Sequence, residues 1–382
     1  MRIRAHAALA ALALVSAGAL AAQDFPLPSG AVTIRFPDDS PVLFSGSVAD
    51  QSRARARGGA MEIDLHLQMT LRNVGPREIR GITLRVISQE VAVGGKGSVA
   101  YPSLHVAQGD SFPVRIDMQL MRPSQAISGP VVEVSLDGVL FQDLSFYGAN
   151  RLNSHRTMLA WELEARRDRE YFKRVLAQSG ADGLRSAVLA SLERQAERPR
   201  LDVRVLSGGP AVTAAAVAPE RTQQFAFLEL PDSPVSPKDG WARVSGNEAR
   251  GPRVEIRNNS NRVVKYVELG WLVSDQNGKR YMAASLPASG PDLILKPGQT
   301  ARVLQDTALR FSRQGQPVNI QGVSGFVSQV EFADGEMWVP NRQSLERADL
   351  LDLVAPSAEE QRLSDLYRKR GISALVEELK KY

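Results

Sequence analysis

The chain has 382 residues, of which 43% are hydrophobic and 23% are charged, a composition typical of a globular protein with packed cores and enough length for two or three domains. The formal net charge is +5, or +3 without Arg2 and Arg4, which is too small to indicate nucleic-acid or membrane binding. The sequence contains no cysteine, which excludes disulfides, thiolate metal sites and cysteine nucleophiles.

Residues 1–22 have the pattern of a secretory signal peptide. Arg2 and Arg4 precede an apolar stretch from Ala7 to Val15, and Ala19-Leu20-Ala21 supplies small residues for cleavage. The alternative is a buried N-terminal helix. We expect export to the periplasm or the cell exterior, and no later stretch is apolar for long enough to span a bilayer.

Residues 23–150 predict a first β-sandwich, and residues 151–197 predict a helical hairpin. Ile63, Leu65 and Leu67 alternate with polar residues, which indicates a strand with one face in a core. The helical pattern that begins near residue 154 is interrupted between Gly180 and Gly183. Residues 198–237 are rich in Pro and Ala and predict a linker, with the alternative that residues 225–230, FAFLEL, add a strand to one sandwich.

Residues 238–345 repeat the pattern of the first sandwich. Residues 256–271 match residues 71–86, at a shift of 185 positions (256 − 71). Asn277-Gly278 predicts a hairpin turn. Two further pairs extend the match: Asp334-Gly335 with Asp137-Gly138, taken as turns, and Asn341-Arg342 with Asn150-Arg151.

Residues 346–382 predict a C-terminal helical hairpin, interrupted at Gly371. The fold class predicted from the whole chain is therefore mainly β with helices, as two β-sandwiches that are each followed by a helical hairpin.

The second copy resembles the FxLYD-type, immunoglobulin-like domains of secreted and envelope-anchored bacterial proteins. The resemblance lies in IRNNSNRVVKYVELGWLVSDQNGK and LKPGQT, although LVSD stands where LYD is expected and the first copy lacks the Asp-x-x-Gly. It implies an immunoglobulin-like sandwich in each copy and a role as a binding or spacer module. It implies no active site and no cofactor.

The chemistry-bearing residues of the chain form no recognisable catalytic or metal-binding motif. His66, His105 and His155 lack the spacing of metal ligands, and we expect ordinary surface or hydrogen-bonded histidines. No nucleophile elbow, phosphate loop or complete calcium loop is present. The sequence therefore predicts no catalytic residue, no metal and no cofactor. Trp271 and Trp338 are expected in the core, whereas an exposed row of tryptophans would favour sugar binding.

Arg53, Arg55 and Arg57 alternate with alanine, so an extended backbone would place all three on one face. We consider them a candidate interaction loop for phosphate groups or acidic glycans. The alternative is a solvated loop between the first two strands.

The functional hypothesis is a non-catalytic protein-interaction or scaffold component of the bacterial cell envelope. The expected partner is another envelope protein, or an acidic or glycan surface, and not a nucleic acid. Three alternatives remain open: a carbohydrate-binding module, a hydrolase with dispersed carboxylates, and a periplasmic chaperone with an exposed edge strand and a basic cleft. A concave pocket that holds two acidic side chains would favour the hydrolase.

Overall fold

The computed structural model describes residues 24–382, apart from residues 28, 49–51, 91–93, 124–129, 200, 208–218, 289–292 and 305–306. The predicted signal peptide at 1–22 lies outside the described residues. Strands account for 46% of the structure and helices for 23%, which confirms the prediction of a mainly β protein with helices. No described helix is long and apolar enough to cross a membrane.

The chain divides into two compact units. Unit 1 comprises the described residues of 1–75, 84–99 and 109–136, and unit 2 comprises those of 76–83, 100–108 and 137–382. This division differs from the predicted domains, because unit 2 takes the ends of several first-sandwich strands together with both helical segments. At one such end, the backbone at Gly81 packs closely against Met158: a Cβ atom added at Gly81 would lie 3.0 Å from Met158 Sδ.

The N-terminal part of the chain forms two sheets. One has the order β1-β4-β5-β3 with β8 also paired to β5, and the other has the order β10-β9-β6-β7 with β2 parallel to β9. The bounds are β1 (Asp24–Pro26), β2 (Val32–Arg35), β3 (Val42–Val48), β4 (Arg53–Arg57), β5 (Ala60–Asn73), β6 (Ile79–Ile87), β7 (Lys96–Tyr101), β8 (Ser111–Pro123), β9 (Val132–Phe141) and β10 (Phe146–Tyr147), with a short 3₁₀ turn at Ser29–Ala31. The predicted alternation is confirmed in β5, where Ile63, Leu65 and Leu67 are buried.

The described strands of the C-terminal part form a sheet of the order β11-β18-β14-β13-β12-β20-β15-β16, with β17, β19 and β21 paired to its side. The bounds are β11 (Asp202–Ser207), β12 (Arg221–Phe227), β13 (Val235–Ser245), β14 (Glu248–Asn258), β15 (Val264–Ser274), β16 (Arg280–Pro287), β17 (Thr300–Leu304), β18 (Thr307–Arg313), β19 (Gln316–Pro317), β20 (Gly322–Phe332) and β21 (Met337–Trp338). Trp271 lies in the core of this part, as expected. The turn at Asn277-Gly278 joins β15 to β16, with Gly278 at φ 73°.

Residues 198–237 are not a linker throughout, because they include β11 and β12. β12 pairs antiparallel to β13 and parallel to β20. Its aromatic side chains hold it in place: the ring centroids of Phe225 and Phe227 lie 4.8 and 6.4 Å from that of Trp271. The expected strand at FAFLEL is therefore present in part: β12 (Arg221–Phe227) includes Phe225 and Phe227, but it lies between β13 and β20 and not at an edge of the sheet.

The sequence comparison placed the counterpart of the Asp334-Gly335 turn at Asp137-Gly138, but the structure places it elsewhere. Asp137 is buried in β9, and its carboxylate accepts hydrogen bonds from the backbone N–H groups of Arg151 (2.9 Å) and Leu152 (3.2 Å). The counterpart of Asp334 is Asp143, which lies 191 positions earlier (334 − 143). Asp143 and Asp334 each accept a hydrogen bond from the backbone N–H two residues on, at 3.0 and 3.1 Å.

A second interaction recurs at the same place in both halves of the chain. The guanidinium of Arg77 lies 4.0 Å from the centroid of the Phe141 ring, and that of Arg262 lies 3.9 Å from the centroid of Phe332. Each arginine also faces the aspartate of its own turn. The shift of 191 positions found for the aspartates therefore also relates Phe141 to Phe332 (332 − 141).

The helices are α1 (Ser154–Glu197), α2 (Arg342–Arg347) and α3 (Ala358–Leu379). α1 is interrupted at Gly180 (φ 63°, ψ −163°) and α3 at Gly371 (φ 77°, ψ −177°), a backbone conformation that glycine adopts at little cost. Gly180 and Gly371 are also 191 positions apart (371 − 180). Each long helix is thus folded back at an equivalent glycine.

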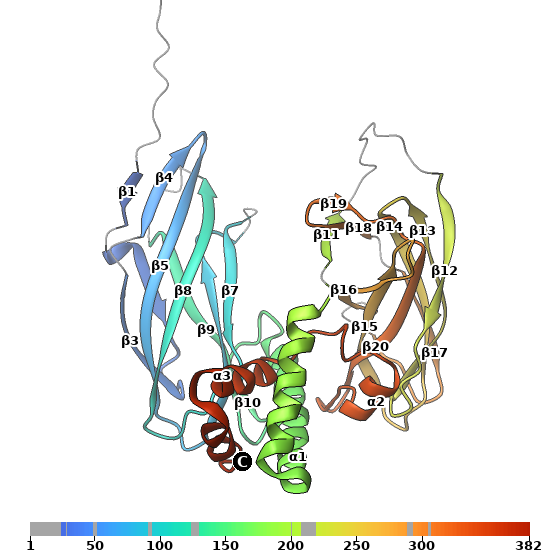
Figure 1. Cartoon of the computed structure of the whole chain (residues 1–382). Coiled ribbons are helices and arrows are strands. Elements are labelled where there is room, and N and C mark those ends of the chain that lie inside the picture. Colours follow the sequence, from blue (N-terminus) through green and yellow to red (C-terminus); the bar gives the residue numbers. More distant parts are fainter. Residues whose placement is uncertain are drawn as a thin grey trace, which may run out of the picture. The chain divides into compact units, whose positions relative to one another are not determined.

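The two folded helices pack against one another, as Figure 1 shows for α1 and α3. Their shared core consists of six buried side chains: Phe172, Leu184 and Val188 of α1, and Leu363, Leu375 and Leu379 of α3. Each of the first three has its counterpart 191 positions later among the second three (363 − 172, 375 − 184 and 379 − 188). The apolar faces of the two hairpins therefore cover each other within unit 2.

Candidate functional site

One face of α1 lines a cavity of about 800 Å³ within unit 2, named here the Glu164 pocket. The residues of α1 that line it follow the helical spacing of three to four positions, among them Thr157, Trp161, Glu164 and Arg167. The other walls come from β15, β16, β20 and the segment 354–361, and include Tyr266, Glu268, Met282, Ser285, Phe326, Ser328, Gln329 and Gln361. Polar and apolar side chains thus alternate around the cavity.

Glu164 is the acidic group of α1 that faces this cavity. Its side chain is half-buried, and it makes no hydrogen bond or ion pair with any residue that the structure describes. Burial raises the pKa of the Glu164 carboxyl to about 7, with further contributions from Asp168 and Glu268, while Arg167 opposes the shift. Glu164 therefore changes its protonation state near neutral pH.

On the opposite wall, β15 presents a tyrosine and a second carboxylate. The hydroxyl of Tyr266 donates a hydrogen bond of 2.7 Å to Glu268 Oε2. The guanidinium of Arg156 lies 3.8 Å from the centroid of the Tyr266 ring, and its Nε donates to Glu331 at 2.5 Å. Burial, and next the hydrogen bond to Glu268, raise the pKa of Tyr266 above its ordinary value, so this hydroxyl remains a donor.

The third wall, from β20, carries an unsatisfied acceptor. The side-chain oxygen of Gln329 is buried and has no hydrogen-bond partner among the described residues. Nearby on the wall, the hydroxyls of Ser285 and Ser328 hydrogen-bond each other at 2.8 Å. Buried acceptors without partners are uncommon in folded proteins and mark places where a further donor would be stabilising.

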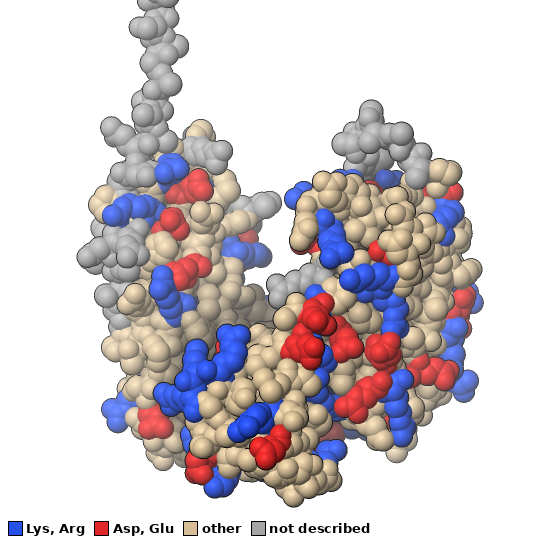
Figure 2. Space-filling view, in the orientation of Figure 1, with Lys and Arg blue, Asp and Glu red and all other residues tan. Residues whose placement is uncertain are grey.

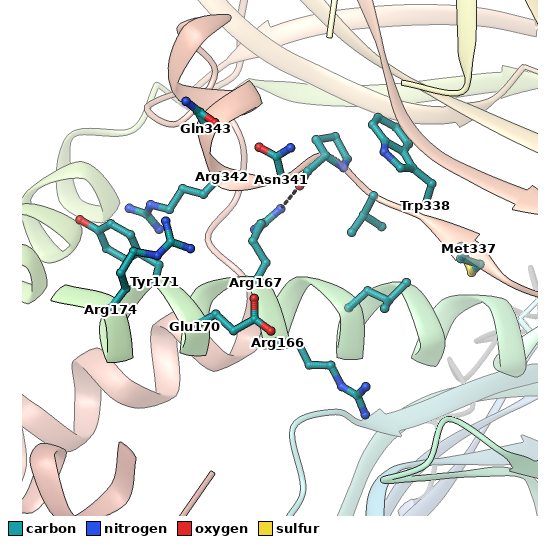
Figure 3. A pocket seen from close by; sticks show the side chains of 13 residues that line it. Arg166, Arg167, Glu170, Tyr171, Arg174, Met337, Trp338, Asn341, Arg342 and Gln343 are labelled. Atoms are coloured by element: carbon teal, nitrogen blue, oxygen red, sulfur yellow. Dashed lines mark hydrogen bonds between the residues drawn. The ribbon is translucent and has the colours of Figure 1, made fainter. Parts of the chain in front are cut away.

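A second cavity, of about 460 Å³, lies along α1 beyond Arg167 and is named here the arginine pocket (Figure 3). The guanidinium of Arg342 lies 3.7 Å from the centroid of the Tyr171 ring, and Arg167 donates to the carbonyl of Pro340 at 3.2 Å. Figure 3 shows Arg166 pointing away from these groups. Arg167, Val339 and Pro340 line both pockets.

The arginines of this second pocket are largely engaged by carboxylates. Arg342 Nη1 lies 3.6 Å from Asp168 and 3.8 Å from Glu360, and Arg167 pairs with Asp168 at 3.0 Å. The positive charge of the arginine pocket is therefore mostly balanced, in contrast to the unpaired carboxyl in the Glu164 pocket.

Arg53, Arg55 and Arg57 lie in β4 and not in a loop, which corrects the expectation of an interaction loop. β4 pairs with β1 and β5, and Ala54 is buried whereas Ala56 is exposed. Arg53 and Arg55 are exposed in unit 1, directly across from Asp64 and Glu62 of β5. These carboxylates reduce the local positive charge that the sequence run suggested.

Two of the three histidines that the sequence singled out have ordinary structural partners. His66 Nδ1 lies 2.6 Å from Asp117 Oδ1, and this hydrogen bond raises the pKa of His66. Burial lowers the pKa of His155, whose ring centroid lies 5.0 Å from that of Phe146. Within the described residues, no group of three or more His, Asp or Glu side chains could hold a metal ion.

His105 belongs to a buried charged cluster that the sequence did not indicate, named here the Tyr382 cluster. The ring centroids of His105 and Tyr382 lie 4.5 Å apart. Burial, and next the charge of Arg80, lower the pKa of His105 to about 3, so the ring is neutral. The remaining members form ion pairs: Arg80 with Glu78 (3.3 Å), Arg169 with Glu162 (2.7 Å), and Arg362 with Glu359 (2.8 Å) and Glu378 (2.6 Å).

A basic surface covers the turn of α3 in Figure 2, where Arg368, Lys369 and Arg370 are exposed. These residues close the first helical half of α3, just before Gly371. Cationic side chains in the last turn of a helix are stabilised by the partial negative charge of its carbonyl groups. This position gives the three residues a structural role, and Arg368 also pairs with Asp365 at 3.2 Å.

The sequence missed the Glu164 pocket because its walls come from segments more than a hundred residues apart. A signal does exist in α1: Trp161, Glu164 and Arg167 follow one another at three-residue spacing and so share a face. The spacing does not reveal that β15 and β20 lie opposite that face.

No protein-family model and no curated protein sequence matches the chain. Among solved structures, a selenomethionine-labelled β-glucosidase from Kluyveromyces marxianus is similar at 9% identity over 71% of this chain and 45% of that chain, with a TM-score of 0.14. A red sea bream transglutaminase is similar at 9% identity over 75% of this chain and 31% of that chain, with a TM-score of 0.13. The chain spans less than half the length of these proteins, and scores this low carry no structural or functional inference.

Proposed function

We propose that the protein is a non-catalytic, exported binding component of the bacterial cell envelope, which receives part of a protein partner in the Glu164 pocket. One observation carries the proposal: Glu164 is a carboxyl group without a partner among the described residues, facing a cavity of about 800 Å³. A half-buried carboxyl group is only partly compensated by solvent, and a ligand that supplies a donor would add the missing interaction on binding.

The pocket is a better candidate than the surfaces that the sequence favoured. The apolar faces of the two helical hairpins pack on each other, so they are not free to form a groove for a partner. Arg53 and Arg55 face carboxylates across the β4–β5 pair. The Glu164 pocket combines apolar side chains with polar and charged ones, which can together fix and orient a bound group.

The cellular and architectural parts of the proposal rest on separate observations. Export is supported by the pattern of residues 1–22. Two immunoglobulin-like sandwiches are supported by the recurrence of equivalent elements, such as the parallel pairs β2–β9 and β12–β20 and the arginine–phenylalanine contacts at Arg77 and Arg262.

A photo-crosslinking experiment tests the proposal. A benzophenone side chain is introduced at Thr157, which is exposed and lines the pocket, or at Ser186, which is exposed on α1 and does not line it. After irradiation in intact cells, we expect one crosslinked protein for the Thr157 probe and none of the same mass for the Ser186 probe. Equal crosslinking at both positions, or none at Thr157, would overturn the proposal.

A second candidate, the hydrolase with dispersed carboxylates, is favoured by the presence of Glu164 and Glu268 in one cavity. Glu164, with a pKa of about 7, suits a general acid, and Glu268 is a carboxylate held by the hydroxyl of Tyr266. Turnover of chromogenic glycosides or ester substrates by the purified protein, abolished by Glu164→Gln, would establish this candidate. Crosslinking without any turnover would leave the binding role.

A further inference from the structure

We propose that the Glu164 pocket recognises the ammonium group of a lysine side chain on the protein partner. This inference rests on the proposed function and names the chemical group that the pocket selects. It follows from the acceptors that line the cavity, from the apolar walls, and from the charges around Glu164.

The acceptors that line the cavity come from two different elements. Glu164 of α1 has no partner among the described residues, and Glu268 of β15 accepts a hydrogen bond from Tyr266. An ammonium group has three donors and no acceptor, so it can address acceptors from several directions at once.

The walls suit the stem of a lysine side chain. Leu152, Met282 and Phe326 contribute apolar surface to the cavity, and Trp161 contributes an aromatic ring from α1. Lysine buries its four methylene groups against such surfaces while its charged end reaches a polar group. Aromatic rings add attraction for a cation. An amino sugar would instead place several hydroxyls against these apolar walls.

The charges near Glu164 set the pH at which the site binds. Arg167 and Asp168 face it from α1, and Glu268 and Tyr266 face it from β15. Arg156 of α1 also lines the cavity and is paired with Glu331. Among the described residues that line the pocket, those from β16, β20 and the segment 354–361 carry no charge. The carboxylate form of Glu164 binds the cation, and lysine stays protonated up to a pH of about 10. Affinity should therefore rise with pH up to about 7 and level off above it.

The test titrates the purified full chain with Nα-acetyl-lysine N-methylamide and follows the indole N–H signal of Trp161 by NMR. We expect saturable binding of this probe, at least tenfold weaker binding of the analogue acetylated on the Nε atom, and about tenfold weaker binding for each pH unit below 7. The Glu164→Gln variant should lose at least tenfold in affinity. The matched control Glu170→Gln changes the same kind of side chain on the exposed part of α1 and should bind as the wild type does.

Several outcomes would overturn the inference while leaving the proposed function in place. Equal binding of the charged and acetylated probes would show that the ammonium group is not recognised. Unchanged affinity in Glu164→Gln would remove the carboxylate from the site. Saturable binding of glucosamine without binding of the lysine probe would show that the pocket binds amino sugars and not lysine side chains. The proposed function itself would be rejected by the crosslinking experiment, through equal crosslinking at Thr157 and Ser186 or none at Thr157.

Discussion

The Tyr382 cluster and the Glu164 pocket both hold charged side chains away from bulk water, but they treat those charges differently. In the cluster each acidic side chain faces an arginine, as Glu359 faces Arg362 at 2.8 Å. In the pocket Glu164 faces a cavity and has no partner among the described residues. Paired buried charges hold helices together, whereas an unpaired one stores free energy that a ligand can release.

The same substitution in both places should have opposite effects, and the larger effect is expected in the cluster. Glu359→Gln removes a fully buried carboxylate that pairs with Arg362 and lies 3.5 Å from Arg169. We expect the free energy of unfolding to fall by about 3 kcal/mol, because the buried Arg169 and the partly exposed Arg362 lose part of their compensation. Urea denaturation followed by circular dichroism measures this. The exposed Glu377→Gln serves as control and should change stability by less than about 1 kcal/mol.

Glu164→Gln is expected to stabilise the protein above pH 7. The folded state raises the pKa of Glu164 from 4.5 to about 7. The folded state of the wild type therefore has its full stability below pH 4.5, where Glu164 is neutral in both states. Its stability decreases as the pH rises to about 7, because folding must then bury a carboxylate. The variant lacks this loss and should be more stable by about 1–3 kcal/mol at pH 8. Thermal unfolding at pH 5 and pH 8 would detect it, and a variant that is less stable at pH 8 would break the comparison.

The smallest effect is expected at the exposed arginines of β4. The triple variant Arg53/Arg55/Arg57→Ala removes Arg53 and Arg55, which lie across from Asp64 and Glu62 on the surface of unit 1, together with Arg57, which lies across from Ala60. Exposed cross-strand ion pairs contribute about 0.2–1 kcal/mol each, so the change in stability should stay near 1 kcal/mol in total. Crosslinking from Thr157 should be unaffected. Loss of the crosslink in this variant would show that β4 contributes to the contact with the partner.

Much of the strand pattern could be predicted because it depends on neighbouring residues. The alternation at Ile63, Leu65 and Leu67 and the turn at Asn277-Gly278 are local features, and both appear in the structure. A strand at β12 was predicted only as an alternative, because the prolines around it suggested a linker, and its place in the sheet depends on packing of Phe225 and Phe227 against Trp271.

The candidate site was less predictable for a different reason. A helical stripe in the sequence indicates that a face is covered but not what covers it. The apolar stripes of α1 and α3 cover each other, and the polar stripe with Glu164 faces strands that lie about a hundred positions later in the chain. Asp137 shows the same limit, since Asp-Gly suggested a turn where the carboxylate in fact holds the start of α1 through Arg151 and Leu152.

The shared core of the two hairpins also constrains when the molecule can assemble. Phe172 and Leu363 belong to one core although 191 positions separate them (363 − 172). Until the last turns of α3 are synthesised, the apolar face of α1 has nothing to cover it, and closing so long a loop is entropically costly and slow. In a nascent chain, the shared core of the two hairpins therefore stays incomplete until Leu375 and Leu379 have been added.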